Sequence, residues 1–206
     1  MTDPEPVSEE LTAVDVDDFT NGRLRDDAGG GETTRLLNAA LTVARRRVGW
    51  HVSPVIEDDE IVTDGPGWYK LYLPTRKIVT VASIEDGGVE VDAADYVVAA
   101  NVPGLVIRTA GTWSDDMSAI TVTLDHGFTA AEAADWRQAI LMMVDQMSMA
   151  KAAATGTRAD VDLVRKKVNN VEYQWTDGQS LALAETAVFS VENILCGYEL
   201  IPALFV

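Results

Sequence analysis

The spacing of apolar residues predicts two helices that frame the middle of this chain. Over residues 34–50 the apolar positions recur every three or four residues, which is typical of an amphipathic helix. A second and longer pattern begins at Thr129, where Thr-x-x-Glu has the form of a capping box, and it ends at Gly156. The apolar positions of this long helix include Trp136, Ile140, Met143, Met147 and Ala150.

The segment between the two helices has the pattern of a small antiparallel sheet. Residues 60–125 contain short, β-branched and often alternating runs, namely WYKLYLP, KIVTVASIEDG, VEVD, DYVVAA, LVIRTAG and AITVTLDHG. Turn sequences such as DGPG, EDGG and NVPG separate these runs. The EDGG turn between two β-branched runs indicates a hairpin.

Asp125-His126-Gly127 joins the last predicted strand to the long helix, and it raises the question of an active site. Gly127 can adopt unusual dihedral angles and Asp125 can bond nearby amides, so a structural corner explains the motif. A general base needs an orienting partner and a nucleophile within hydrogen-bond reach, and adjacent residues rarely point at each other. Nothing else in the sequence completes a catalytic set. A hydrolase that uses Asp125, His126 and a carboxylate near 57–60 is therefore only an alternative.

The two ends of the chain predict arms. Residues 1–31 are acidic and glycine-terminated, with a short helix expected around Val14–Phe19. Beyond Gly156 a polar link leads to an alternating strand at 171–175, and a last helix is expected over 185–196. We expect an α+β fold that is mainly a helical bundle with a long central helix, an inserted small antiparallel β-sheet and extended arms. Its expected parts are an acidic N-terminal arm (1–31), a helix, β-insertion and long-helix core (32–156), and a C-terminal arm with strand, short helix and apolar tail (157–206).

The charge balance argues against free binding to nucleic acid. The 206 residues include 33 Asp and Glu against 16 Lys and Arg, a formal net charge of −17. Affinity for DNA phosphates comes from Lys and Arg that displace counterions. The acid is concentrated in residues 1–32 and 57–64. These blocks are interpreted as solvated surface, or as a surface that repels DNA while DNA moves past it.

Motifs for cofactors, metals and membranes are missing from the sequence. GGGETT lacks the Lys-Ser/Thr of a phosphate loop, and His51 and His126 have no zinc-type spacing. The carboxylates at 57–60 lack the central glycine of a calcium loop. Cys196 stands alone, which predicts no disulfide and a small buried apolar residue. No stretch of 18 apolar residues predicts a membrane span, and the acidic start is not a signal peptide.

Two apolar features predict contacts with other protein chains instead. The last residues are too apolar to lie free in water at no cost, so they are expected to pack on the core or on another chain. The predicted docking residues are Leu200, Ile201, Leu204, Phe205 and Val206, together with Tyr173 and Trp175. The long helix is apolar on more than one side, as packing between subunits requires. Its predicted subunit contacts are Ile140, Leu141, Met143, Val144 and Met147.

The order in which these segments follow one another along the chain is itself informative. It runs through LYLPTRKIVTVASIEDGGVEVDAADYVV, LVIRTAGTW, ITVTLDHGF, the helix AADWRQAILMMVDQMSM, RKKVNNVEYQW and CGYELIP. Over about residues 34–200 this order resembles the head-to-tail adaptor (connector) proteins of long-tailed bacteriophages. The acidic residues 1–31 do not map onto that family, and the β insertion is larger than in its smallest members.

The resemblance implies a structural virion protein without catalytic activity or cofactor. Such adaptors are helical bundles with a β insertion, and they form a closed ring, typically of twelve copies, under the portal protein. Their C-terminal segment reaches the portal or a neighbouring copy, the other face receives the neck stopper or a tail protein, and genomic DNA passes through the lumen without specific binding. The implied location is the virion neck, after synthesis in the host bacterial cytoplasm, with no membrane partner.

Other functions remain as alternatives. Another neck or head-completion protein, such as a stopper or tail terminator, belongs to the same class. The long capped helix and the terminal helix argue against a stopper, which resembles a β-barrel. The hydrolase described above and a soluble acidic binding module come from different classes.

Overall fold

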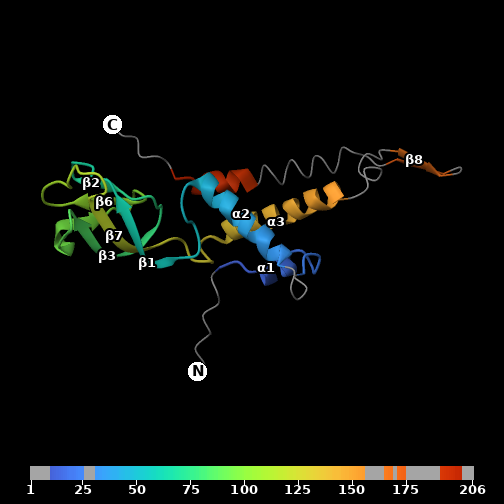
Figure 1. The fold of residues 1–206 in the computed structure, drawn as a ribbon, viewed down its shortest axis with the longest axis horizontal. Helices are drawn as coiled ribbons and strands as arrows, with labels where there is room; N and C mark the ends of the chain where they lie inside the picture. Colours follow the sequence, from blue (N-terminus) through green and yellow to red (C-terminus); the bar gives the residue numbers. More distant parts are fainter. Residues whose placement is uncertain (1–9, 26–30, 156–164, 169–170, 175–190, 201–206) are drawn as a thin grey trace, which may run out of the picture. The chain divides into compact units, whose positions relative to one another are not determined.

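The computed structural model divides the chain into two compact units, each assembled from segments that are far apart in the sequence (Figure 1). It describes residues 10–25, 31–155, 165–168, 171–174 and 191–200. The first, here called the β unit, comprises Met1–Glu10, Arg45–Ala134 and Tyr198–Val206. The second, the helical unit, comprises Leu11–Ala44 and Asp135–Gly197.

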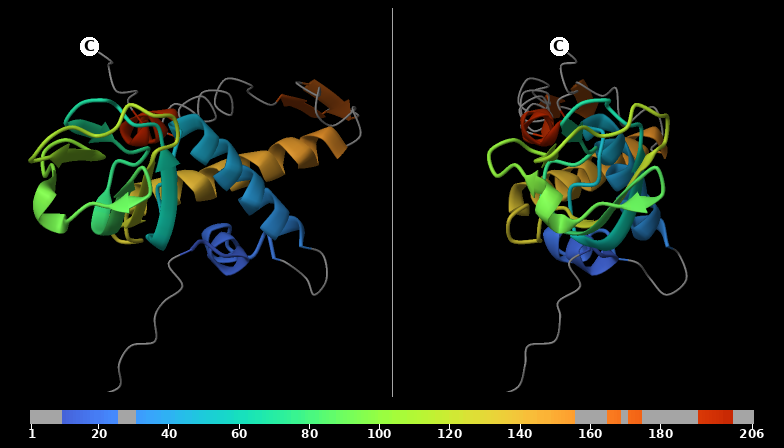
Figure 2. Two further views of the ribbon diagram at one scale, coloured as in Figure 1. Left: turned by 60° about the vertical axis from the view of Figure 1, so that its left-hand side comes forward. Right: turned by 90° about the vertical axis from the view of Figure 1, so that its left-hand side faces the viewer.

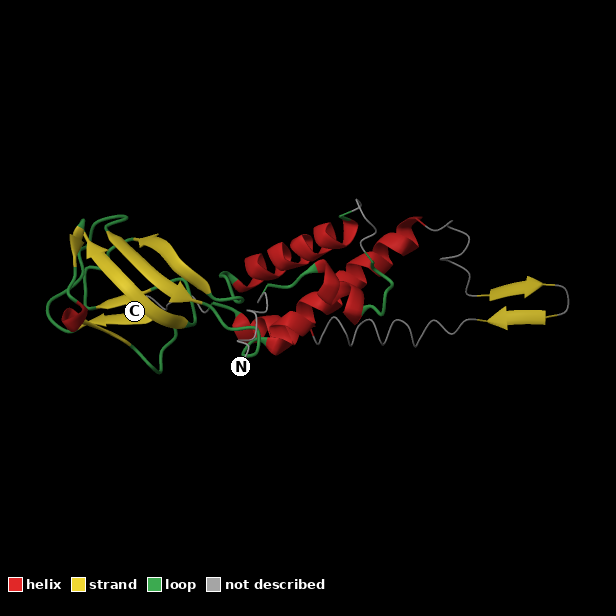
Figure 3. Cartoon of the chain, turned by 90° about the horizontal axis from the view of Figure 1, so that it is seen from below, coloured by secondary structure: helices red, strands yellow, loops and turns green. Residues whose placement is uncertain are grey.

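Antiparallel strands build the β unit (Figure 3). One sheet has the order β1-β7-β3-β4, with the bounds Ile56–Thr63, Ile120–His126, Ile78–Asp86 and Val89–Glu90. The other has the order β2-β6-β5, with the bounds Lys70–Tyr72, Leu105–Arg108 and Tyr96–Val98, and a short 3-10 helix η1 (Ala93–Asp95) precedes β5. Turns between short strands explain this topology, and the predicted EDGG hairpin joins β3 to β4.

Both sheets contribute residues to one apolar core in the β unit. Figure 2 shows the strands of this unit from two further sides. Along β7, Ile120, Val122, Leu124 and His126 are buried while the residues between them are half-buried, which is the two-residue period of a strand. The buried core residues are Leu71, Leu73, Ile84, Val91, Val106, Trp113, Ile120, Val122 and Leu124. His126 therefore lies at the end of a core-facing row.

The helical unit contains α1 (Ala13–Phe19), most of α2 (Glu32–Val48) and most of α3 (Ala134–Thr155). Residues 191–198 are also helical, and β8 (Arg165–Val168) pairs with β9 (Val171–Gln174) as an antiparallel hairpin. The buried apolar residues of this unit are Leu11, Val16, Leu37, Ala40, Leu41, Ala44, Trp136, Ala139, Ile140, Val144, Val191 and Leu195. On α2 and α3 they recur every three or four residues, as the sequence pattern predicts.

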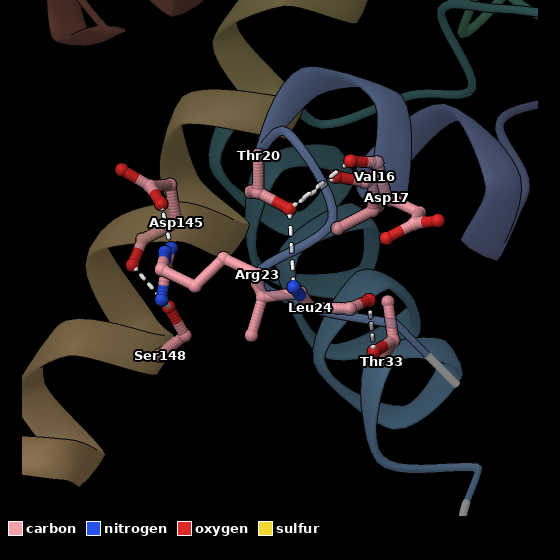
Figure 4. Close-up of polar contacts among 8 residues, drawn as sticks. All are labelled: Val16, Asp17, Thr20, Arg23, Leu24, Thr33, Asp145 and Ser148. Atoms are coloured by element: carbon pink, nitrogen blue, oxygen red, sulfur yellow. Dashed lines mark hydrogen bonds and ion pairs between the residues drawn. The ribbon is translucent and has the colours of Figure 1, made fainter. Parts of the chain in front are cut away.

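A chain of polar contacts fixes the segment after α1 in the helical unit (Figure 4). The Thr20 hydroxyl donates to the Val16 carbonyl at 2.8 Å and accepts from the Leu24 amide at 3.2 Å. Arg23 then reaches α3, where its Nη1 donates to the Ser148 hydroxyl at 3.0 Å and its Nη2 pairs with the carboxylate of Asp145. These contacts attach α1 to the long helix.

The α+β class is confirmed, but a mainly helical bundle is not, because the sheets of the β unit form a core of their own. The short helix expected near the N-terminus exists as α1, and its Val16 is fully buried. The contacts thus group part of residues 1–31 with the helices. A capping box between Thr12 and Asp15 and the apolar Leu11 and Val16 explain why this acidic stretch folds.

Cys196 requires a correction, because it is exposed rather than buried. The buried positions of its helix are Val191 and Leu195. One residue further on, the side chain is turned by about 100° around the helix axis, away from that buried row. Its thiol lies 3.7 Å from a carboxylate oxygen of Glu192.

Candidate functional site

The corner at Asp125-His126-Gly127 forms as the sequence predicts, and it separates the two candidate catalytic groups. Asp125 and His126 project from opposite faces of β7. Asp125 accepts the Thr80 hydroxyl at 2.5 Å and the Asp58 amide at 2.9 Å. The Thr80 hydroxyl, and then the Asp58 amide, hold the pKa of this carboxyl below its usual range. Asp125 is thus a half-buried structural acceptor that does not face the imidazole.

Gly127 makes the corner possible. Its φ of +113° favours glycine, and a Cβ atom here would lie 2.8 Å from the Pro54 carbonyl oxygen. Its amide donates to the Lys77 carbonyl at 2.9 Å, and the next amide, of Phe128, donates to Val52 at 2.8 Å. The strand end is therefore fixed on both sides by backbone hydrogen bonds.

A β-bulge brings a different carboxylate to His126. The pairing of β1 with β7 shifts between Ile56, opposite His126, and Asp59, opposite Leu124. Such an extra residue re-aims the side chains beside it. His126 Nε2 lies 2.9 Å from Asp59 Oδ2, and because a carboxylate oxygen accepts, Nε2 carries the proton. The hydrolase alternative names a carboxylate near 57–60, and the structure brings Asp59 of that block to His126, although the sequence does not single out Asp59 among the four.

The two histidines of the chain lie together at this corner. The rings of His51 and His126 pack edge to face with centroids 6.2 Å apart, and His51 Nε2 donates to the Pro54 carbonyl at 2.5 Å. Burial lowers the pKa of His51, the bond to Pro54 opposes this, and the charge of Arg45 adds to the lowering. His51 stands before β1 and His126 ends β7, so the sequence gives no spacing that signals their contact.

The corner has the carboxylate–imidazole pair of a hydrolytic site, but among the described residues the imidazole makes no hydrogen bond to a hydroxyl or thiol that could act as the nucleophile. His126 Nδ1 is buried and has no hydrogen-bond partner among the described residues. The His126 side chain is only 4% exposed, so a substrate would have little access to it. Within the described part of the chain, no group of three or more His, Cys, Asp or Glu side chains could hold a metal ion. The arrangement suits a buried hydrogen bond that closes the end of the core.

A second cluster fixes the start of the predicted docking segment. Trp50 Nε1 donates to the Tyr198 carbonyl at 2.7 Å, and the Leu200 amide donates to the Val48 carbonyl at 2.7 Å. Phe128 packs edge to face on Trp50 and on Tyr198, with centroids 5.9 and 5.6 Å apart. Residues 198–200, here called the tail root, are thereby held on the β unit.

Charged groups add to the tail root. Arg47 pairs with the Glu199 carboxylate at 3.2 Å, and Arg76 Nη1 donates to the Glu199 carbonyl at 3.3 Å. Leu200 is half-buried. The other predicted docking residues of the tail, Ile201, Leu204, Phe205 and Val206, and also Trp175, lie outside the described residues. Tyr173 lies on β9, where the backbone alone is described.

The predicted subunit contacts on α3 divide into two groups. Ile140 and Val144 are fully buried by this chain itself, so they stabilise the helical unit. Leu141, Met143 and Met147 are half-buried. Contact with a neighbouring copy remains a prediction, and it rests on these three side chains. Methionine suits such a surface because its flexible thioether adapts to different neighbours.

No helix in the described ranges is both long enough and apolar enough to cross a bilayer.

The carboxyl of Glu132, which precedes α3, has its pKa lowered first by the Thr129 amide and then by Lys77. With the Glu132 amide donating back to the Thr129 hydroxyl at 3.3 Å, the predicted capping box is formed. It lies in a turn just ahead of α3.

No protein-family model and no curated protein sequence matches the chain. Solved structures share its fold. A chain in the neck of the native gene transfer agent (GTA) particle, computed with C12 symmetry, has a TM-score of 0.55 at 15% identity, over 100% of this chain and 99% of that chain. A chain in the neck of the empty GTA particle, computed with C6 symmetry, has a TM-score of 0.54 at 15% sequence identity, and the match covers 95% of this chain and 92% of that chain. A chain in the virion of the native GTA particle has a TM-score of 0.54 at 14% sequence identity, and the match again covers 95% of this chain and 92% of that chain. The predicted resemblance is thus confirmed at the level of the fold, which is that of a neck component of a phage-like particle.

Proposed function

We propose that this protein is a structural component of the neck of a phage-like particle, and specifically a head-to-tail adaptor. The observation that carries the proposal is the match of fold over the whole chain to a chain of the GTA neck. In this role the protein is located in the virion, forms a ring of identical copies, binds the portal on one face and a neck stopper or tail protein on the other, and lets genomic DNA pass.

Three further observations support a ring of identical copies. The similar neck was computed with C12 symmetry, which suits twelve copies. A cyclic ring needs two different, complementary patches on each subunit. The half-buried Met143 and Met147, four residues apart on α3, share one face of the helix and offer one apolar patch. The apolar sequence beyond the tail root offers a second. The net charge of −17 would let DNA move through the lumen without adhering, because the excess of carboxylates repels the DNA phosphates.

Imaging of the purified protein with a portal protein tests this proposal. We expect negative-stain micrographs to show rings seated on the portal, whereas the protein alone is expected to stay monomeric. Solitary particles with the portal supplied would contradict the proposal. A stopper or tail terminator would instead bind only after an adaptor has been added.

Removal of residues 201–206 tests the docking role of the tail while leaving the tail root in place. The shortened chain should keep its fold, because the hydrogen bonds of Tyr198 and Leu200 are retained. We expect it to lose binding to the portal or to the neighbouring copy. Unchanged rings on the portal would show that the tail is not a docking segment. His126→Ala is the matched control for an enzymatic role, and it should leave ring formation intact.

A further inference from the structure

A pocket of about 280 Å³ opens on the β unit beside the tail root. One wall is the segment Arg76–Ile78, and the other runs from Val98, at the end of β5, to Gly104, just before β6. The lining is mixed: Val98 and Val102, which are 37% and 41% exposed, stand beside the polar side chains of Arg76, Lys77 and Asn101. Exposed apolar surface that is grouped in a concave site is typical of a binding site for another apolar group.

The walls of the pocket are held in place before anything binds. Gly104 has a φ of +67°, and a Cβ atom there would lie 2.2 Å from the Thr75 carbonyl oxygen. Its own carbonyl accepts from the Leu73 amide at 2.8 Å, and the Ala99 amide donates to Leu105 at 2.9 Å. On the other side, Lys77 pairs with Glu132 at 3.0 Å. A preformed pocket costs little reorganisation when it is filled.

The position of the tail root identifies an occupant. Arg76 lines the pocket and also donates to the Glu199 carbonyl at 3.3 Å, so residue 199 lies next to the pocket wall. The following residues, Ile-Pro-Ala-Leu-Phe-Val, carry no charged side chain and supply four large apolar ones beyond the root, namely Ile201, Leu204, Phe205 and Val206. Six extended residues span at most roughly 20 Å, which is ample for a pocket that begins one arginine side chain away.

We propose that residues 201–206 occupy this pocket of their own chain in the unassembled protein, with an apolar side chain of the tail packed against Val98 and Val102. The apolar tail is then shielded from water until the protein meets its assembly partner, where the same residues dock. This inference goes beyond the proposed function, because it concerns the free chain and holds whichever partner the tail later binds.

An engineered disulfide tests the proposal. In a Cys196→Ser background, Phe205→Cys is combined with Val102→Cys, which lines the pocket, and mild oxidation is followed on non-reducing gels. We expect a bond within one chain. The matched control combines Phe205→Cys with Val97→Cys, which is 54% exposed on the same strand as Val98 but is not part of the pocket, and we expect no bond. A bond between two chains would show that a second copy supplies the tail, and it would overturn the proposal, as would the absence of any bond.

Amide hydrogen exchange in the otherwise unaltered chain provides a second measurement. The amides of residues 203–206 should exchange roughly tenfold or more slowly than those of a free peptide of the same sequence. Val102→Asp should remove this protection while leaving exchange in β7 unchanged, and Val97→Asp should have no effect on the tail. Free-peptide exchange rates in the unaltered protein would refute the inference. Ring formation on the portal is assayed separately. Free-peptide exchange rates in the tail would therefore refute only the occupation of the pocket, and absence of rings would refute only the adaptor role.

Discussion

At the scale of single residues, His126 makes a part-buried hydrogen bond to Asp59, and two substitutions of Asp59 can measure its contribution to stability. Asp59→Ala leaves the Nε2 proton without an acceptor, whereas Asp59→Asn retains an oxygen that can accept it. We expect the free energy of unfolding to fall by about 1 kcal/mol or more in Asp59→Ala, and by less than about 0.5 kcal/mol in Asp59→Asn. Urea denaturation at neutral pH measures both. Equal losses in the two variants would show that this hydrogen bond does not stabilise the fold.

The lowered pKa of His51 predicts that the stability of the fold depends on pH. Burial lowers its pKa in the folded chain, so below the ordinary value of roughly 6.5 the unfolded chain binds the proton more readily. The contribution of His51 is therefore complete above that pH and is lost as the pH falls below it. His51→Gln keeps a donor for the Pro54 carbonyl but does not titrate. We expect the variant to lose less stability than the natural chain between pH 7 and pH 5.5, and identical losses would contradict the assignment.

The residues at this corner also show how far the sequence carries a prediction. Gly127 and Asp125 identify the corner because turn chemistry is local. The pairing of His126 with Asp59 is not local, since it depends on a β-bulge that adds residues to β1 opposite the end of β7. A bulge changes which side chain faces the core, and no alternation in the sequence of β1 reveals it. The same holds for His51, which reaches His126 through the fold alone.

At the scale of elements, the link between α1 and the long helix predicts unequal effects for two nearby arginines. Arg23 contacts both Ser148 and Asp145 of α3 (Figure 4), whereas Arg25 is largely exposed and lies 3.4 Å from Asp17. We expect Arg23→Ala to lower the free energy of unfolding by about 1 kcal/mol, and Arg25→Ala by less than about 0.5 kcal/mol. Thermal or urea unfolding of the two variants side by side measures the difference. Equal effects would mean that α1 is held by apolar packing alone.

The elements themselves were predictable where their signal is periodic. The patterns of α2 and α3 appear within a few residues of their predicted bounds, because one apolar face per helix must be buried. The start of α3 was less predictable, since the Thr129 capping box closes a turn and the helix begins at Ala134. The strand β8 carries Arg165, Lys166 and Lys167, so its composition favours a solvated turn over a strand.

At the scale of the whole molecule, the two units could not be foreseen from the order of segments. Each unit combines stretches that are far apart in the sequence, because helices and antiparallel sheets each bury apolar surface best with partners of their own kind. In this arrangement the start of the predicted apolar tail is bound to the β unit. Its root at residues 198–200 belongs to the β unit through the contacts of Trp50, Phe128 and Val48. Aromatic residues scattered in the sequence give no hint of that cluster.

The proposed ring predicts that the half-buried methionines of α3 contact a neighbouring copy and contribute little to the stability of a single chain. Met143→Gln combined with Met147→Gln preserves side-chain length and helix propensity but makes the surface polar. We expect the variant to keep its melting temperature within a few degrees, roughly the effect of 1 kcal/mol, because Ile140 and Val144 still fill the core. Rings on the portal should be lost. Met117→Gln, at a side chain that is 85% exposed in a loop of the β unit, is the control and should assemble normally. Rings that form equally well with both variants would place the contact between copies elsewhere on the chain.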